Sequence, residues 1–406
     1  MIKRIAAILI VFCCIFAGCK TQAGSKIEKG TETIVPWLPN VEPTAVYDWM
    51  AGESPVPVKR MGVARYGVSN VYHAISPSGI YFMQEALEGF DTYIWYVDHG
   101  SNQMIKLCGR ADCMHDSPDC NAYVYDGRFL SYYGGYLYAV SGGGSDRECK
   151  LIRMNVDGTN RVTVLDMLKF SEENGGDGAQ CEVFTEGVLL FHTFAYTMQT
   201  SGGSTQLTPK TLEYYLYRLD GSTPQPVPQK TQGVVYNCGD MVMGISAETR
   251  NGGELSIWKI DLQTDTSEYL TDHPGVQGYY AETEGYYFKD GAIRRFIYET
   301  QTEEILVDTG LEGNYVLRVF PDCLVVAANG LEYTEDNHFY VYNWGFELVD
   351  TIEIPYQYDV GTQHLLISET AERFILSTTY AGFPRYYINK SELGTGNVKV
   401  HAFVLP

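Results

Sequence analysis

The sequence predicts an all-β fold, a β-propeller of seven four-stranded blades over residues 68–406, and three observations carry this prediction. The chain contains 32 Tyr and 41 Gly but only 19% charged residues, a composition that favours strands and turns over helices. A turn leads into an apolar or aromatic strand seven times along the chain. These strand starts recur about every 49 residues, a period typical of a propeller blade.

Each repeat contains two clear strands and, in several cases, shorter ones beside them. The seven starts of the first clear strand are Gly79, Gly135, Gly187, Asp240, Gly285, Asp322 and Arg373. The second clear strand covers residues 93–97, 151–154, 215–219, 257–260, 293–296, 339–342 and 385–388. Shorter segments precede these pairs at 71–75 and 315–319 and follow them at 304–307 and 347–349. Residues 164–173 are predicted to form one short helix. A pair of β-sandwiches is the alternative to the propeller fold.

Two Asp-Gly turns support the hairpins of the second and third repeats. Asp157-Gly158 lies within the run Arg-Met-Asn-Val-Asp-Gly-Thr-Asn at 153–160, and Asp220-Gly221 follows a strand in the next repeat. Asp-Gly suits tight hairpins because Gly adopts positive φ at little cost. The run at 153–160 resembles a strand and turn of TolB-like and YWTD-like propellers and of related repeats in bacterial lipoproteins. This resemblance implies a propeller.

The first nineteen residues predict export and lipid attachment. Lys3 and Arg4 precede an apolar run over residues 5–16, which is too short to span a membrane and is typical of a signal peptide, here residues 1–18. Phe16-Ala17-Gly18-Cys19 resembles the lipobox of bacterial lipoproteins, although Leu is usual where Phe16 stands. The resemblance implies that Cys19 is diacylated and becomes the new N-terminus. We therefore expect a protein anchored by lipid to the extracytoplasmic face of a bacterial cell membrane.

Residues 19–67 predict a lipidated cysteine and a tether. The segment has no sustained hydrophobic period, and five prolines lie between residues 36 and 57. Docking of its later half on the folded domain is the alternative, because Trp37, Tyr47 and Trp49 are apolar enough to pack there.

The charge of the chain excludes nucleic acid as a partner. The formal net charge is −21, and removal of residues 1–18 deletes Lys3 and Arg4 and takes it to −23. So acidic a surface repels nucleic acid and anionic lipid, and no basic stripe offsets it.

One segment brings several chemically reactive side chains together in the sequence. Cys108, Cys113, His115 and Cys120 follow the spacing Cys-x4-Cys-x-His-x4-Cys, which supplies the ligands of a closed Cys₃His zinc site. A disulfide within the segment and a set of reduced thiols are the alternatives. Seven cysteines remain after residues 1–19 are set aside, and an odd number leaves one thiol outside any set of internal disulfides. The segment resembles a feature of uncharacterised propeller-like lipoproteins from clostridial bacteria, which implies a cell-surface setting and no particular activity.

The sequence contains no Gly-x-Ser-x-Gly elbow, His-Glu-x-x-His helix, phosphate-binding loop or dinucleotide-binding fingerprint. His73 and His364 fall on predicted inner strands that would line the central channel, and Glu182 and Glu282 fall on others. Histidines at such positions are more often hydrogen-bonded fillers of the wall, and carboxylates are too numerous for one pairing to carry weight.

The sequence therefore predicts a binding module without catalytic activity. Its ligand would be a surface glycan, a peptide or an envelope protein. Two alternatives remain: a propeller-type hydrolase or lyase acting on carbohydrate, and a metal- or redox-responsive surface protein that uses the Cys/His segment.

Overall fold

The computed structural model divides the chain into two units, residues 1–39 and residues 40–406, and the described residues all belong to the second. They are 46–52, 54–56, 73–85, 91–142, 148–185, 187–201, 204–227, 235–238, 241–246, 255–262, 264, 266–273, 278–328, 337–354, 364–378 and 384–405. The predicted signal peptide, Cys19 and most of the predicted tether lie outside them. Among the described residues, no helix is long and apolar enough to span a membrane.

Consecutive strands pair antiparallel to form the first three sheets. The first contains β1 (His73–Ile75), β2 (Gly79–Glu85), β3 (Asp91–Asp98), β4 (Met104–Lys106) and β5 (Tyr123–Tyr125). The second contains β6 (Phe129–Tyr133), β7 (Tyr136–Gly142), β8 (Cys149–Asn155) and β9 (Val162–Asp166). The third contains β10 (Gly178–Thr185), β11 (Val188–Ser201), β12 (Ser204–Arg218) and β13 (Gln225–Pro226).

Four more sheets repeat this order through the rest of the described chain. The fourth contains β14 (Val235–Cys238), β15 (Met241–Ser246), β16 (Leu255–Asp261) and β17 (Thr266–His273). The fifth contains β18 (Gly278–Tyr280), β19 (Glu284–Lys289), β20 (Ala292–Ile297) and β21 (Thr302–Asp308). The sixth contains β22 (Tyr315–Val319), β23 (Leu324–Ala328), β24 (His338–Tyr342) and β25 (Leu348–Glu353). The seventh contains β26 (His364–Glu369), β27 (Arg373–Thr378), β28 (Pro384–Asn389) and β29 (His401–Ala402).

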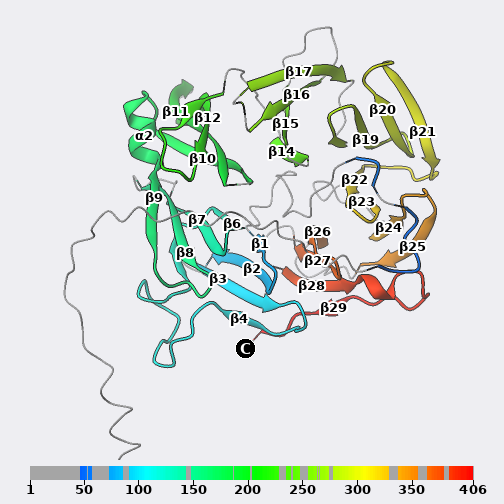
Figure 1. Cartoon of the computed structure of the whole chain (residues 1–406), viewed down its shortest axis with the longest axis horizontal. Coiled ribbons are helices and arrows are strands. Elements are labelled where there is room, and N and C mark those ends of the chain that lie inside the picture. Colours follow the sequence, from blue (N-terminus) through cyan, green and yellow to red (C-terminus); the bar gives the residue numbers. More distant parts are fainter. Residues whose placement is uncertain are drawn as a thin grey trace, which may run out of the picture. The chain divides into compact units, whose positions relative to one another are not determined.

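The sheets are arranged around a common centre, with the first strand of each sheet innermost and the last outermost (Figure 1). The fold is therefore a β-propeller, as predicted. Each repeat start found in the sequence begins, within two residues, the second strand of a sheet, and each alternating segment lies in the third strand, apart from residue 219, which follows β12. The predicted helix is shorter than expected. Residues 164–166 belong to β9, and α2 (Met167–Glu173) begins where the Asp166 carboxylate accepts a hydrogen bond from the Lys169 amide at 3.0 Å.

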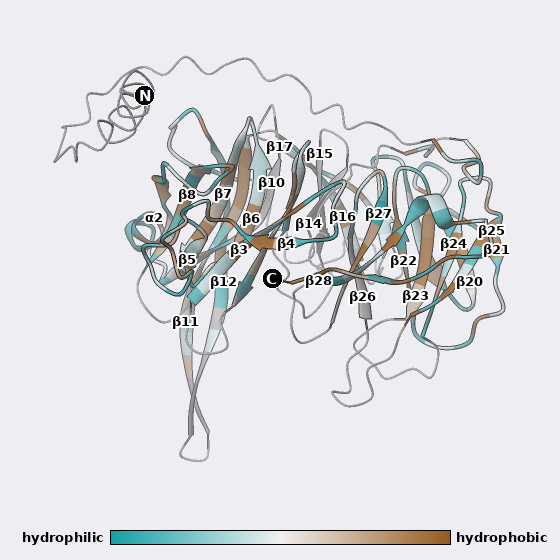
Figure 2. Cartoon of the chain, turned by 90° about the horizontal axis from the view of Figure 1, so that it is seen from below, coloured by the Kyte–Doolittle hydropathy of each residue, from teal (hydrophilic) through white to brown (hydrophobic). Residues whose placement is uncertain are grey.

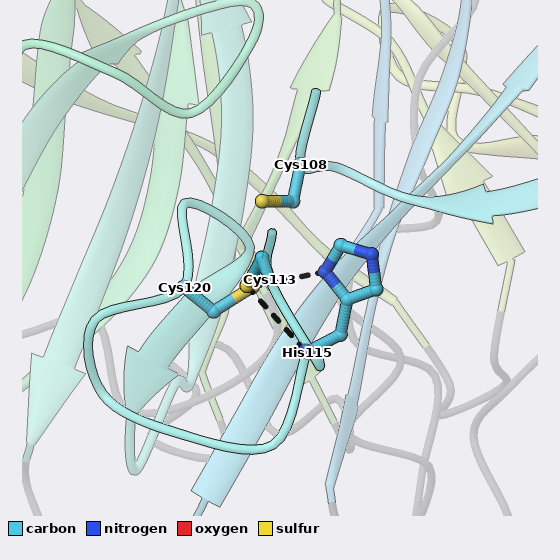
Figure 3. Close-up of side chains that lie close together, drawn as sticks. All are labelled: Cys108, Cys113, His115 and Cys120. Carbon is cyan, nitrogen blue, oxygen red and sulfur yellow. Dashed lines mark hydrogen bonds between the residues drawn. The ribbon is translucent and has the colours of Figure 1, made fainter. Parts of the chain in front are cut away.

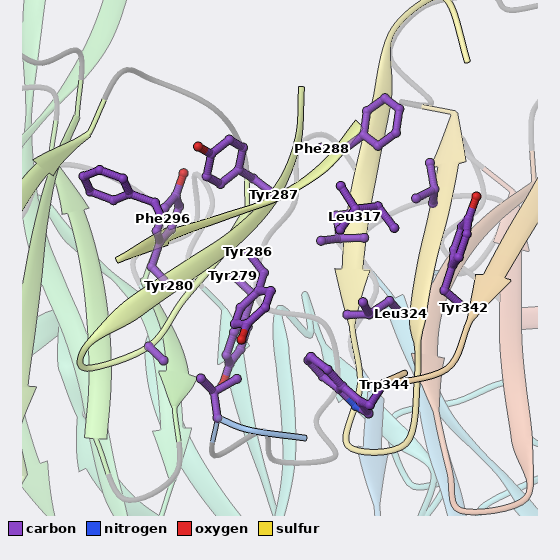
Figure 4. Close-up of a cluster of buried hydrophobic side chains, with 14 of the residues drawn as sticks. Tyr279, Tyr280, Tyr286, Tyr287, Phe288, Phe296, Leu317, Leu324, Tyr342 and Trp344 are labelled. Carbon is purple, nitrogen blue, oxygen red and sulfur yellow. The ribbon is translucent and has the colours of Figure 1, made fainter. Parts of the chain in front are cut away.

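The core lies between adjacent sheets and explains part of the tyrosine content. The largest cluster joins the fifth and sixth sheets and contains the fully buried Tyr280, Tyr286 and Tyr287 (Figure 4). The Tyr286 hydroxyl donates to Glu284 Oε1 at 2.7 Å, and the Tyr287 hydroxyl donates to the Glu303 carboxylate. Tyrosine thus fills the space between sheets with an apolar ring while its hydroxyl stays hydrogen-bonded.

The C-terminal residues join the seventh sheet to the first. Val404 pairs in parallel with Gln103, and its carbonyl accepts a hydrogen bond from the Met104 amide at 2.9 Å. Phe403 is 8% exposed and packs in a cluster with residues of both sheets, among them Phe82 and Ile375. Within the described part of the chain, the four strands of the seventh sheet all come from residues 364–402, and the segment that follows β29 joins this sheet to the first.

Part of the expected tether packs on the sixth and seventh sheets. The Trp49 indole donates to the Lys390 carbonyl at 2.9 Å, and the Tyr47 hydroxyl donates to the Ala371 carbonyl at 3.3 Å. The Asn343 side chain donates to the Trp49 carbonyl at 3.2 Å. Docking of these residues was the alternative to a free tether. All three partners lie in turns between first and second or third and fourth strands. Successive turns of an antiparallel sheet alternate between its ends, so this segment lies on one face of the ring.

Candidate functional site

The Cys/His segment leaves the first sheet from the middle of its outer edge. β4 and β5 both pair with β3, β4 at Trp95–Val97 and β5 at Asp91–Tyr93, so residues 107–122 interrupt one outer strand. Ile94 closes the base of this loop: its carbonyl accepts from the Leu107 amide and its amide donates to the Ala122 carbonyl, each at 2.8 Å. The loop itself contains turns and bends but no strand. We call residues 107–122 the Cys/His loop.

The four predicted ligands converge inside this loop. One side-chain atom from each of Cys108, Cys113, His115 and Cys120 lies within 4.8 Å of all the others. Figure 3 shows the three cysteine side chains gathered on one side of the His115 imidazole ring. The separation between Cys120 Sγ and His115 Nδ1 is 3.5 Å. Cys120 is buried, the other three are half-buried, and all three cysteines are free thiols in the structure.

Backbone groups hold the sulfur atoms and the histidine in place. The His115 amide donates to Cys113 Sγ and the Ala122 amide donates to Cys120 Sγ, each at 3.4 Å. His115 adopts a φ of 58°, a left-handed conformation in which Asn, Asp and His are enriched among the residues other than Gly. The Lys106 ammonium donates to the His115 carbonyl at 2.8 Å and lies 4.5 Å from the centre of the Tyr93 ring. Lys106 of β4 therefore ties the His115 backbone to the sheet.

The thiols of the loop differ in acidity. Burial tends to raise the pKa of the Cys108 thiol, but hydrogen bonds from backbone groups of Arg110 and Asn121 and from the neighbouring thiols leave that pKa below its ordinary value. Burial raises the pKa of the Cys120 thiol to about 11, against hydrogen bonding by the Ala122 amide. Cys108 is thus the more readily ionised of the two.

The second sheet contacts the same loop through residues of its Asp-Gly turn. The Arg161 guanidinium donates to the carbonyls of Tyr123 and Asn121, and its Nε donates to the Gly158 carbonyl at 3.1 Å. Burial lowers the pKa of Arg161, whereas the nearby Cys120 and Cys108 raise it. Gly158 has a φ of 79°, and a Cβ added to it would lie 2.3 Å from the Asn121 carbonyl oxygen. Residues 158–161 therefore fit against the loop backbone with no room for a larger side chain at position 158.

The candidate catalytic residues do not form one described site. His73 is buried on β1 beside the Phe82 ring, with ring centroids 6.3 Å apart. Glu282 lies in the turn after β18 rather than on an inner strand, and its carboxylate forms an ion pair with Lys259 of β16. The side chains of Glu182 and His364 lie outside the described residues.

A second feature is a hairpin that extends beyond its own sheet. β11 pairs with β10 only as far as Phe194, whereas β11 and β12 continue to pair with each other as far as Ser201 and Ser204 (Figure 2). We call residues 195–209 the arm. At 3.4 Å per residue it reaches about 24 Å past the sheet. The turn at its tip joins second and third strands, so the arm leaves the face of the ring opposite to the docked segment that contains Trp49.

The arm differs in charge and edge protection from the rest of the surface. No Asp, Glu, Lys or Arg occurs between Glu186 and Lys210, although the chain has a net charge of −21. Tyr196 is 43% exposed and Met198 71% exposed. β12 carries Pro209 and Lys210, residue types that block pairing at an edge, but the β11 edge at 195–201 carries neither. The sequence shows this uncharged stretch, but only the strand pairing shows that it projects.

The strand order alone places the chain among β-propellers. Comparison with known proteins adds no family: no protein-family model and no curated protein matches the chain. Similar solved structures include the β-propeller domain of the Trilobed protease from Pyrococcus furiosus, at 9% identity and a TM-score of 0.41 over 71% of this chain and 82% of that one. The computationally designed Ika8 protein is similar at 13% identity and a TM-score of 0.40, over 86% of this chain and 100% of that one. A chain of a nidogen/laminin complex is similar at 12% identity and a TM-score of 0.34, over 57% of this chain and 77% of that one.

Proposed function

We propose that this protein is a lipid-anchored, extracytoplasmic β-propeller that binds an extended segment of an envelope protein and catalyses no reaction. The observation that carries the proposal is the arm, with its uncharged surface and the edge of β11 that no described strand covers beyond Phe194. An extended peptide adds to such an edge through main-chain hydrogen bonds, and exposed side chains such as Tyr196 and Met198 supply selectivity.

Hydrogen-bond directions indicate where the added strand would pair. On β11 the Phe194 carbonyl accepts from the Asp177 amide at 2.8 Å, and the Tyr196 amide donates to the Asp177 carboxylate at 2.7 Å. Alternation along the strand then directs the amide and carbonyl groups of Met198 and Thr200 to the same side, past the end of β10. Asp177 ends the native pairing at Tyr196 and leaves the next residues of the edge for a partner.

The attachment of the predicted tether also leaves the arm accessible to a partner. Cys19 lies 27 residues before Val46, a distance of about 30 Å for a flexible chain. The segment at 46–52 docks on the face opposite to the arm, so the predicted tether meets the ring on the face away from the arm. The acidic remainder of the surface disfavours contact with anionic lipid, whereas the arm carries no charge to repel a partner.

Site-specific photo-crosslinking in cells tests this function. A photo-reactive residue at position 198 should give a discrete protein adduct, and replacement of residues 197–208 by Asn-Gly should abolish partner binding while leaving the thermal unfolding temperature unchanged. Position 156 is the matched control, because Val156 is 40% exposed in the turn between β8 and β9, on the opposite face. In parallel, Cys19→Ser should move the protein from the membrane fraction to the soluble fraction.

Two results would overturn the proposal. Equal adducts at positions 156 and 198, or partner binding that survives the shortened arm, would exclude the arm as the binding element. Cleavage of a polysaccharide that is lost in His73→Ala or Glu282→Gln would show that the protein is an enzyme.

A further inference from the structure

We infer that the Cys/His loop binds one zinc-like divalent ion through Cys108, Cys113, His115 and Cys120, and that this ion holds the loop and the seam between the first and second sheets in place. This inference is independent of the proposed function, because the loop and the arm belong to different sheets.

The convergence of four donors is the first argument. Zinc binds thiolate sulfur at about 2.3 Å and imidazole nitrogen at about 2.0 Å, so the ligand atoms of a tetrahedral site lie about 3.5 to 3.8 Å apart. The four side-chain atoms here lie within 4.8 Å of one another, and Cys120 Sγ lies 3.5 Å from His115 Nδ1. A movement of a few tenths of an ångström in each side chain therefore completes a tetrahedron.

The identity of the donors is the second argument. A disulfide joins two sulfur atoms at about 2.05 Å and leaves the third cysteine and the histidine without a role in the bond. All four donors meet at one point instead, and three sulfurs with one imidazole form a soft set that favours zinc over calcium or magnesium. Four protein ligands leave no open coordination position for substrate. The ion would therefore be structural.

The surroundings balance the charge of the complex. Three thiolates and one divalent ion carry a net charge of −1. The Arg161 guanidinium interacts electrostatically with Cys108 and Cys120 and is fixed to the loop by the carbonyls of Asn121 and Tyr123. Hydrogen bonds from the His115 and Ala122 amides to Cys113 and Cys120 are of the kind that orient thiolate ligands.

The loop also needs an ordering element of this kind. It has no strand of its own, its backbone pairs with Ile94 at its two ends, and the Lys106 side chain holds the His115 carbonyl between them. Arg161 and Gly158 of the second sheet rest on loop backbone near Asn121. Binding of a metal in the folded state stabilises such a segment directly, since the unfolded chain has no preformed site. Loss of the ion should release the loop first and then loosen the contact with residues 158–161.

Metal content and proteolysis of the mature chain test the inference. Protein purified without oxygen or chelator should contain about one zinc per chain by elemental analysis, and cobalt substituted for zinc should show sulfur-to-cobalt charge-transfer bands. Cys113→Ser should lose both signals. Cys181→Ser is the matched control, because Cys181 is a half-buried thiol outside the cluster, and it should keep both. Chelation should make the exposed Arg110 a rapid trypsin site, with cleavage about tenfold faster.

The opposite results are equally clear. Fewer than seven reactive thiols in the denatured mature chain, with no bound metal, would establish a disulfide and overturn the inference. Retention of zinc by Cys113→Ser would exclude this ligand set. If Cys113→Ser does not fold, the cobalt spectrum of the unaltered chain decides, because bands without thiolate character would place the metal elsewhere. None of these results would affect the crosslinking experiment at position 198, which tests the proposed function separately.

Discussion

At the scale of single residues, two Asp-Gly turns of the same type have different surroundings. Gly158 and Gly221 both have positive φ, 79° and 82°, and both follow an aspartate whose carboxylate accepts a hydrogen bond from the backbone amide two residues on. A Cβ at position 221 would meet nothing within 4 Å, whereas one at position 158 would lie 2.3 Å from the Asn121 carbonyl oxygen. The Asp-Gly motif thus predicts the turn but not its contact with the Cys/His loop.

This difference gives a prediction with a built-in control. Both Gly→Ala variants should suffer backbone strain of about 1 kcal/mol, because alanine disfavours positive φ. Gly158→Ala should lose about 2 kcal/mol more in the free energy of unfolding, since the Asn121 backbone has to move. Denaturant unfolding measures both. Equal losses in Gly158→Ala and Gly221→Ala would show that the turn does not support the loop.

At the scale of the sheets, a buried charged group joins the sixth sheet to the seventh. Lys390 is 0% exposed, and its ammonium donates to both carboxylate oxygens of Asp322 at 3.0 and 2.8 Å and to the Glu369 carboxylate. Asp322 lies in the turn between β22 and β23, and Glu369 ends β26. Rings of Phe320 and Phe374 lie on the same ammonium at 5.9 and 4.9 Å.

Removing this cation should be costly, because it leaves two buried carboxylates without it. Lys390→Met should lower the free energy of unfolding by about 3 to 5 kcal/mol. Lys169→Met is the matched control: Lys169 is exposed on α2 near Glu173 and its replacement should change stability by less than about 0.5 kcal/mol. Urea unfolding of both variants makes the comparison. A loss below about 1 kcal/mol in Lys390→Met would show that the charged group does not couple the two sheets.

At the scale of the whole molecule, closure of the ring depends on a few C-terminal residues. Phe403 fills the seam between the first and seventh sheets, and Val404 hydrogen-bonds to Asn102 and Met104. Among the described strands, none of either sheet completes the other, so side-chain packing and these short pairings hold the seam. A propeller closed in this way should be sensitive to shortening at its end.

Truncation tests this closure. Deletion of residues 403–406 should lower the thermal unfolding temperature by about 5 °C or more and broaden the transition, because a buried aromatic side chain and its hydrogen bonds are lost. Deletion of residues 405–406 alone should have little effect, since Leu405 is 46% exposed. Calorimetry distinguishes the two. An unchanged, sharp transition in the longer deletion would show that the ring closes without its last residues.

Local pattern is sufficient to predict the strands and the Cys/His cluster. The turn-and-strand starts from Gly79 to Arg373 mark the second strand of each sheet because alternation and turn chemistry are properties of neighbouring residues. The four donors from Cys108 to Cys120 lie within one short loop, so their spacing alone brings them close. The placement of Glu282 on an inner strand was wrong, because a two-residue shift moves a residue from strand to turn.

The sequence by itself determined the propeller class, the acidic charge and the identity of the candidate metal ligands, since each depends on composition or on short-range spacing. Only the tertiary structure decided that Trp49 docks on the ring, that Arg161 grips the Cys/His loop and that Lys390 joins two sheets. These contacts link residues far apart in the chain, and nothing in local sequence encodes their partners. The arm depends on both sequence and tertiary structure. Its lack of charge is evident from residues 187–209 of the sequence, whereas its projection is evident only from the point at which pairing with β10 ends.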